Sequence, residues 1–554
     1  MRRPHGVLLI LLTLGTVPKV DSAFLGTVPN RVPKVGSVFP GTVPNLVPNV
    51  GSMFLGTVPN PVPNLGTVPT QSAVGTATEA EARAACTPCH LFPPPDILPK
   101  ANWREEIARM SLIRANVPQP LSSTGAASRM IPLPPDFERV LKYYEANAPA
   151  HLAPPAPWPE PDTSGFVRRS MNPNSPPPDP AVANVRLLDV DGDGRLEVLA
   201  ADMRYGLVMM GKPATDNPKL DVIAQLDNPC HVTMVDINGD GIQDFLVADL
   251  GTLLPGDHTR GSVTLLLGRK DGKYDQRTLG GWPRVADIEA ADFNGDGKLD
   301  LAVAAFGWRK VGNLSVLENR TTDYTHPSFT PHLIDPRPGA IHAIPVDLNK
   351  DGKMDLVVVF AQQFEQVVAF MNNGGPGISF SPQVIYTGPH PNWGSSGIQV
   401  VDLDGDGDLD VLLTHGDTFD DAVVKPYHGI QWLENRGAFP FVEHTLAEMP
   451  GVSRAQAVDL DGDGDLDIVA CALLAGGSDI DETTLPALVW LEQTRPGVFE
   501  RHTLEKGAPR HASLDVGDFD HDGDVDIVVG TFMLVPGSPP STNWVEIWEN
   551  QRAH

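Results

Sequence analysis

From residue 181 onward, short apolar runs recur between polar segments rich in Asp, Asn and Gly. Runs such as 356–359 (LVVV) are dominated by β-branched residues, which favour strands. In segments such as 430–435 (IQWLEN) and 499–504 (FERHTL), polar and apolar residues alternate with the period of a half-buried strand. The pattern therefore predicts a β-rich region over residues 164–554.

The segment before residue 153 has a helical pattern instead. Short helices are predicted at 77–86 (ATEAEARAAC), 103–113 and 136–146 (DFERVLKYYEA), the last beginning near Pro135-Asp136. A small all-α domain is expected over 76–152, followed by a Pro-rich linker at 153–163.

The N-terminus has the features of an exported protein. Arg2 and Arg3 precede the apolar run 7–14 (VLLILLTL), which predicts a signal peptide over 1–23. Residues 24–75 repeat phrases such as GTVPN, and this Gly/Pro/Val composition predicts a low-complexity spacer without a packed core. We expect bacterial-type export to a periplasmic, cell-surface or secreted location, with no transmembrane anchor in the mature chain.

An acidic phrase, D-x-[DN]-x-D-G-x-x-[DE], recurs in the β-rich region at intervals of 47, 56, 55, 55, 57 and 59 residues. Oxygen ligands at positions 1, 3, 5 and 9, with a carbonyl at position 7, suit Ca²⁺. Position 12 is apolar in every copy, so an EF-hand is excluded. The predicted ligands are Asp189, Asp191, Asp193 and Glu197; Asp236, Asn238, Asp240 and Asp244; Asp292, Asn294, Asp296 and Asp300; Asp347, Asn349, Asp351 and Asp355; Asp402, Asp404, Asp406 and Asp410; Asp459, Asp461, Asp463 and Asp467; Asp518, Asp520, Asp522 and Asp526.

The repeats predict the fold. Each acidic phrase is accompanied by four short strands, and seven such units describe a seven-bladed β-propeller. The motif resembles FG-GAP/VCBS repeats, related to the propeller of integrin α subunits, and the resemblance covers about 164–554. The last repeat lacks a fourth strand, so residues 166–171 (FVRRSM) are expected to close the ring. The predicted fold class is mainly β, with a small all-α N-terminal domain.

The acidic phrases also explain the net charge of −28. Most of the excess carboxylates lie in these loops, where up to seven Ca²⁺ ions would offset them. A chain this acidic is not expected to bind nucleic acid, which requires clustered Lys and Arg. The three loops with Asn at position 3 are expected to be weaker sites.

The helical segment contains a C-x-x-C-H motif at Cys86, Cys89 and His90. Two thiols and an adjacent imidazole are the attachment signature of c-type haem. A zinc site would need two further ligands nearby, and a thioredoxin-like motif would need a βαβ setting. The segment resembles a small class I cytochrome c domain with one covalent haem. That resemblance implies a methionine as sixth ligand, for which Met130 ranks ahead of Met110.

The strand before each acidic phrase should be the innermost of its blade, and its polar face should point toward the propeller axis. His231, Asp287, Glu289, His342 and Arg454 are expected to converge there, as candidates for acid–base chemistry or ligand binding. The alternative is a solvated channel without chemistry.

Three functions remain open from the sequence. The first is an electron-transfer protein in which the propeller docks a redox partner, or a carbohydrate or protein ligand, on the face opposite the calcium loops. The second is a propeller enzyme that acts on carbohydrate and passes electrons to the haem. The third is an integrin-like adhesion or carbohydrate-binding surface protein. Enzymatic activity is left undecided.

Overall fold

The computed structural model describes residues 75–117, 131–419, 421–475, 481–507, 509–535 and 541–552. These residues belong to one compact unit that begins at Gln71. The predicted signal peptide, all but the last residue of the predicted spacer, and Met130 lie outside the described residues.

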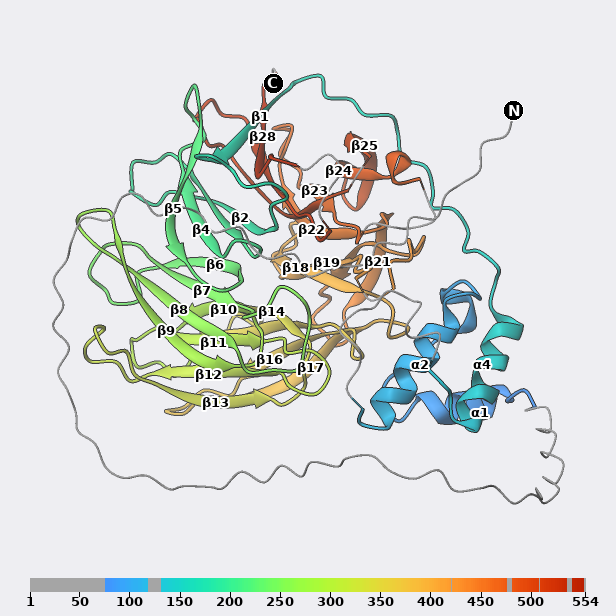
Figure 1. The fold of residues 1–554 in the computed structure, drawn as a ribbon. Coiled ribbons are helices and arrows are strands. Elements are labelled where there is room, and N and C mark those ends of the chain that lie inside the picture. The colour runs from blue at the N-terminus through green and yellow to red at the C-terminus, as the bar shows by residue number, and fades with distance from the viewer. Residues whose placement is uncertain are drawn as a thin grey trace, which may run out of the picture. The chain divides into compact units, whose positions relative to one another are not determined.

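The helices lie where the sequence predicts them (Figure 1). They are α1 (Glu79–Cys86), α2 (Trp103–Arg114) and α4 (Pro135–Asn147), with a short 3₁₀ turn, η1 (Pro95–Ile97). The side chain of Thr78 accepts a hydrogen bond from the amide of Glu81, whose carboxylate accepts from the amide of Thr78. This capping box satisfies amides that would otherwise lack partners, and so defines the start of α1.

Aromatic side chains hold the helices together. The rings of Trp103 in α2 and Tyr144 in α4 stack with centroids 3.9 Å apart, and neither residue is exposed. The Trp103 indole N–H donates to the carbonyl of Pro95, so its one polar group is satisfied inside the core.

The remainder of the described chain is a set of antiparallel sheets (Figure 1). Five sheets have four strands each, in chain order. They are β6–β9 (Pro229–Val235, Asp244–Asp249, Gly261–Gly268, Tyr274–Trp282), β10–β13 (Val285–Ala291, Asp300–Ala305, Asn313–Asn319, Phe329–Asp335), β14–β17 (Ala340–Val346, Asp355–Phe360, Gln366–Asn372, Phe380–Thr387), β18–β21 (Ser395–Val401, Asp410–His415, Gly429–Glu434, Val442–Glu448) and β22–β25 (Val452–Val458, Asp467–Ala472, Pro486–Arg495, Val498–Lys506). A 3₁₀ turn, η2 (Glu482–Thr484), precedes β24.

The first and last strands of the β-region share one eight-stranded sheet, ordered β2-β3-β4-β5-β1-β28-β27-β26. Its strands are β1 (Phe166–Pro173), β2–β5 (Val182–Leu188, Glu197–Asp202, Leu207–Gly211, Lys219–Gln225) and β26–β28 (His511–Gly517, Asp526–Thr531, Val545–Asn550). β1 pairs antiparallel with β28 from Phe166↔Asn550 to Met171↔Val545. The sequence predicts two separate sheets here. They are joined because β1 continues for two residues and pairs in parallel with β5.

The first strands of successive sheets contact one another in a closed circuit: β2, β6, β10, β14, β18, β22, β26 and again β2. Such a circuit of four-stranded units is the arrangement of a β-propeller. The second strand of each unit is buried at all six positions, as in β15 (Asp355–Phe360). Both faces of this strand are covered, and this explains why its central residues are mostly apolar and do not alternate. No helix in the described residues is long and apolar enough to cross a membrane.

Candidate functional site

The acidic loops fold around their own carboxylates. In the first loop, the Asp189 carboxylate accepts hydrogen bonds from the amides of Gly192 (2.8 Å) and Gly194 (3.0 Å). Gly192 and Gly194 have φ of 74° and 87°, a conformation that favours glycine and lets the chain turn back onto Asp189. The loops that begin at Asp236, Asp292 and Asp459 repeat both bonds. In the other three loops the position-6 glycine amide still donates to the first Asp.

The carboxylate at position 9 connects each loop to the sheet. In β7, Asp244 Oδ1 accepts from the amide of Gly268 at 2.6 Å, and Oδ2 accepts from the amide of Ile237 at 3.2 Å. Burial raises the pKa of Asp244 to about 6. Five other loops have Asp at this position with equivalent bonds: Asp300, Asp355, Asp410, Asp467 and Asp526. The sequence predicts these residues as metal ligands, but their structural bonds to the backbone were not foreseen.

Three of the loops bring carboxylate oxygens of positions 1, 3 and 9 within 4.8 Å of one another. They are the loops that begin at Asp189, Asp402 and Asp459. In the first, an ammonium group already lies among the carboxylates. Lys212 Nζ is 2.8 Å from Asp191, 2.8 Å from Asp193 and 3.1 Å from Glu197.

The C-x-x-C-H motif lies at the end of α1. Cys86 is buried and Cys89 is exposed. Cys86 Sγ lies 3.7 Å from the hydroxyl of Tyr144, and burial raises the pKa of the Cys86 thiol. His90 Nδ1 lies 2.7 Å from the carbonyl oxygen of Leu91, a distance that suits an Nδ1–H donor. Its Nε2 would then carry the free lone pair.

Of the two methionines predicted as sixth iron ligands, only Met110 lies within the described residues. Met110 is half-buried on α2 and packs against the core that contains Trp103 and Tyr144. This is the usual environment of a helical methionine that fills a core. Met130 lies outside the described residues.

The polar residues of the first strands link neighbouring sheets. Asn184 in β2 accepts from the amide of Val232 in β6 at 3.1 Å. Asp515 in β26 accepts from the amide of Leu187 in β2 at 2.8 Å. In β2 and β6, side chains of the neighbouring first strand therefore satisfy amides along the strand edge.

Four of the five predicted inner-strand residues form a cluster, here called the inner-strand cluster: His231, Asp287, Glu289 and His342. His231 Nδ1 is 2.8 Å from Asp287 Oδ1, and His342 Nδ1 is 3.4 Å from Asp287 Oδ2. Asp287 Oδ2 also accepts from the amide of Ala343 at 3.0 Å. Thr233 Oγ1 lies 3.3 Å from Glu289 Oε1. Three first strands, β6, β10 and β14, thus supply one group of side chains.

The cluster is electrostatically unusual. Burial raises the pKa of Asp287, but His231 and His342 outweigh that effect and hold it well below its ordinary value. Burial, together with the nearby charge of Asp287, raises the pKa of Glu289 to about 7. Burial lowers the pKa of His342. Asp287 is therefore ionised, and Glu289 titrates near neutrality. Such a pair of carboxyl groups suits acid–base chemistry.

Arg454, the fifth predicted residue, lies in β22 and makes its hydrogen bond elsewhere. Its Nη1 donates to the carbonyl of Ile398 at 3.0 Å. Burial lowers the pKa of Arg454, and Arg186 lowers it further by repulsion. The structure therefore places two guanidinium groups near the inner-strand cluster without a direct ion pair to its carboxylates.

A second group of ring side chains escaped prediction: His390, Trp393, His415, Tyr427 and His428. The rings of Trp393 and His415 stack with centroids 4.0 Å apart, and His428 lies 6.2 Å from His415. Burial lowers the pKa of His390 to about 4 and that of His415 to about 3. These residues lie in irregular loops and at a strand end. No repeating sequence pattern includes them, so the sequence could not predict the group.

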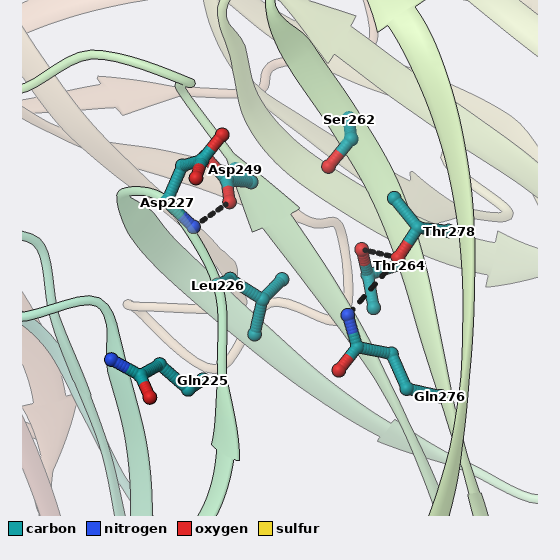
Figure 2. A pocket seen from close by; sticks show the side chains of 8 residues that line it. All are labelled: Gln225, Leu226, Asp227, Asp249, Ser262, Thr264, Gln276 and Thr278. Atoms are coloured by element: carbon teal, nitrogen blue, oxygen red, sulfur yellow. Dashed lines mark hydrogen bonds between the residues drawn. The ribbon is translucent and has the colours of Figure 1, made fainter. Parts of the chain in front are cut away.

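A polar pocket of about 490 Å³ lies beside β5, β8 and β9. Figure 2 shows Asp227 and Asp249 at one end and Thr264, Gln276 and Thr278 at the other. Its polar groups bond to each other, since Thr264 and Thr278 lie 3.0 Å apart and the Asp227 amide donates to Asp249. The pocket holds fewer titratable groups than the inner-strand cluster and is the weaker candidate for chemistry.

Comparisons with known proteins address the repeats. The model of the FG-GAP-like repeat matches residues 236–303 and 347–413. Curated protein sequences give no match.

Among solved structures, the chain is similar to BBS1N in complex with ARL6DN, at 10% identity and a TM-score of 0.44, covering 71% of this chain and 99% of that one. It is also similar to the N-terminal domain of Nup159, at 11% identity and a TM-score of 0.38, covering 72% and 98%. The V. cholerae biofilm matrix protein Bap1 matches at 10% identity and a TM-score of 0.34, covering 69% and 88%. With TM-scores below 0.5, these likenesses carry no functional argument.

Proposed function

We propose that this chain is an exported c-type haem protein in which a calcium-stabilised, seven-bladed FG-GAP/VCBS propeller binds a redox partner or substrate. In this proposal the eight-stranded sheet consists of two blades, β2–β5 and β26–β28 with β1, which the short β1–β5 pairing connects. The helical segment would be the cytochrome c-like domain, and its location would be periplasmic, cell-surface or secreted.

One observation carries the haem assignment. His90 directly follows Cys89, and its Nδ1 lies 2.7 Å from the carbonyl of Leu91. Donation from Nδ1 leaves Nε2 as the ligating nitrogen, and fixes the imidazole for an iron ligand. Cys86, Cys89 and His90 together fit the donor set of a covalently attached haem.

When bound, the haem would supply one-electron redox chemistry. Cys86 and Cys89 would hold the haem through thioether bonds, and His90 would bind the iron through Nε2. Trp103 and Tyr144 are buried in the same core as Cys86, and the Tyr144 hydroxyl lies 3.7 Å from Cys86 Sγ.

The acidic loops support the calcium part of the proposal. Their carboxylates converge in three described loops, and hard oxygen donors of this kind suit Ca²⁺. Bound ions would relieve the repulsion between the acidic side chains of each loop and stabilise the folded state.

The deciding test is a pyridine haemochrome spectrum of the full chain matured with haem-attachment machinery. The proposal predicts one covalent haem per chain, and its loss in the Cys86→Ala/Cys89→Ala variant. The variant Cys230→Ala is a matched control, because Cys230 is a thiol on β6 outside the motif. Absence of covalent haem in the parent chain would contradict the proposal.

A second candidate function rests on the inner-strand cluster. The ionised Asp287 and the near-neutral pKa of Glu289 suit an enzyme that acts on carbohydrate and passes electrons to the haem. Reduction of the haem on addition of sugars, lost in Glu289→Gln, would favour this enzyme. An integrin-like adhesion protein, the third alternative, would show calcium-dependent glycan or protein binding and no redox response.

A further inference from the structure

We propose that His231, Asp287 and Glu289 form a binding site for one divalent transition-metal ion, with His342 positioned as a further ligand. This site lies among the first strands, apart from the acidic loops and from the C-x-x-C-H motif. It goes beyond the proposed haem function and does not depend on it.

Proximity is the first argument. One potential ligand atom from each of His231, Asp287 and Glu289 lies within 4.8 Å of the other two. Ligands on a tetrahedral ion with bonds of about 2.0–2.2 Å are about 3.4 Å apart, so closure requires a movement of the order of 1 Å. Glu289 is half-buried and can supply that movement by rotating its side chain.

The buried pair of His231 and Asp287 is the second argument. His231 Nδ1 and Asp287 Oδ1 lie 2.8 Å apart as an ion pair, and neither atom has a second partner among the described residues. The Asp287 side chain has no exposed surface. This buried carboxylate oxygen therefore depends on one imidazole, and a cation shared by both atoms would stabilise its charge further.

Donor chemistry selects the class of ion. The acidic loops offer only oxygen, which suits Ca²⁺, whereas the inner-strand cluster combines imidazole nitrogen with carboxylate oxygen. This mixed set suits Zn²⁺, Mn²⁺ or Fe²⁺. The side chains of His231 and His342 are 11% and 19% exposed, so an ion can enter and water can complete its coordination.

A similar trio elsewhere in the structure is already neutralised. Glu505, His511 and Glu546 also lie close enough to hold an ion. However, Arg168 pairs with both glutamates, and His511 Nε2 is 2.7 Å from Glu505. Asp287, in contrast, has ion pairs only with histidines among the described residues. The inner-strand cluster therefore has the stronger need for a cation.

Arg454 and Arg186 are the nearby groups that would oppose a cation. Arg454 donates to the carbonyl of Ile398, and Arg186 lies 3.4 Å from Asp515, which offsets its charge. Asp287 and Glu289 together balance a divalent ion.

The test is equilibrium dialysis of the tag-free full chain against Zn²⁺, with excess Ca²⁺ to occupy the acidic loops and metal analysis as the readout. The Cys86→Ser/Cys89→Ser background is used so that the result is independent of haem attachment and free of thiolate zinc binding. We expect one tightly bound zinc per chain. Glu289→Gln should weaken its binding at least about 100-fold, while circular dichroism and the melting temperature in Ca²⁺ report folding.

His332→Gln is the matched control, because His332 forms a comparable pair with Glu318 on an outer strand, with Nε2 and Oε2 2.9 Å apart. It should leave zinc binding unchanged. Asp287→Asn should weaken zinc binding as well, but it replaces one of the two acceptor oxygens at this buried position with an NH2 group. If Asp287→Asn misfolds, Glu289→Gln alone decides the test. No stoichiometric zinc in the parent, or equal zinc in Glu289→Gln, would overturn the proposal.

Discussion

Lys212 Nζ lies 2.8 Å from Asp191 Oδ2, inside the first acidic loop. The ammonium group also reaches Asp193 and Glu197, and these three carboxylates raise the pKa of Lys212. Lys212 directly follows β4, and its side chain would compete with Ca²⁺ for the same oxygens. The sequence predicts weaker calcium binding in the loops with Asn at position 3. The structure adds Lys212 as a second reason for the loops to differ in calcium affinity.

Replacing Lys212 by methionine should create a stronger calcium site in the first loop. We expect Lys212→Met to bind one more Ca²⁺ per chain than the parent in equilibrium dialysis at low micromolar Ca²⁺. Lys219→Met, which removes an exposed lysine of β5, is the control and should leave the stoichiometry unchanged. An unchanged stoichiometry in Lys212→Met would show that the lysine does not compete.

Calcium removal should lower the melting temperature of the propeller. Each occupied loop stabilises the folded state by about 2.7 kcal/mol when free Ca²⁺ is 100-fold above its dissociation constant. Differential scanning calorimetry with Ca²⁺ and with a calcium chelator measures the effect. Equal melting temperatures in both conditions would mean that the loops need no ion for stability.

The two methionines should respond differently to substitution. Met110 packs against the helical core, so Met110→Ala should cost about 1–3 kcal/mol of stability and leave the haem spectrum unchanged. Met130→Ala should remove the methionine–iron charge-transfer band of the oxidised haem. If the band is lost in Met110→Ala and kept in Met130→Ala, Met110 is the sixth ligand.

Acid should destabilise the chain through its buried histidines. The pKa of His415 is about 3 in the folded state, below the ordinary 6.5, because burial disfavours the charged form. The unfolded chain then binds more protons, so this contribution to stability is complete above pH 6.5 and is lost as the pH falls toward 3.

The variant His415→Gln isolates this effect. Between pH 7 and pH 5, its free energy of unfolding should fall by about 2 kcal/mol less than that of the parent. His326→Gln is the control, because the His326 side chain is 89% exposed. Denaturant titrations at both pH values give the comparison, and parallel losses in parent and variant would contradict the prediction.

The pairing of β1 with β28 should matter for stability. Met171 has no exposed surface and packs with Trp544 and Val545, so Met171→Ala should cost about 2–5 kcal/mol. Val167, on the same strand, is 40% exposed, and Val167→Ala should stay within about 0.5 kcal/mol. Urea denaturation measures both losses. A loss of stability in Met171→Ala as small as that in Val167→Ala would mean that β1 contributes little to the fold.

Much of the architecture can be read from local sequence. The three helices follow from their periodicity and, for α1, from the Thr78–Glu81 capping box. The strand after each acidic loop follows from its continuous apolar run, as in β15. The parallel β1–β5 contact could not be predicted, since it joins Asn172 and Pro173 to residues almost fifty positions away.

The sequence by itself determined the repeats, the positions of their strands, and the polar residues that face inward from each first strand. These features depend on local spacing, turn chemistry and the alternation of side chains along a strand. Only the tertiary structure decided that His231, Asp287, Glu289 and His342 meet, that Lys212 occupies an acidic loop, and that His415 is buried beside Trp393. Such contacts join strands and loops from different repeats. Their distances are set by how whole sheets pack, which no local pattern encodes.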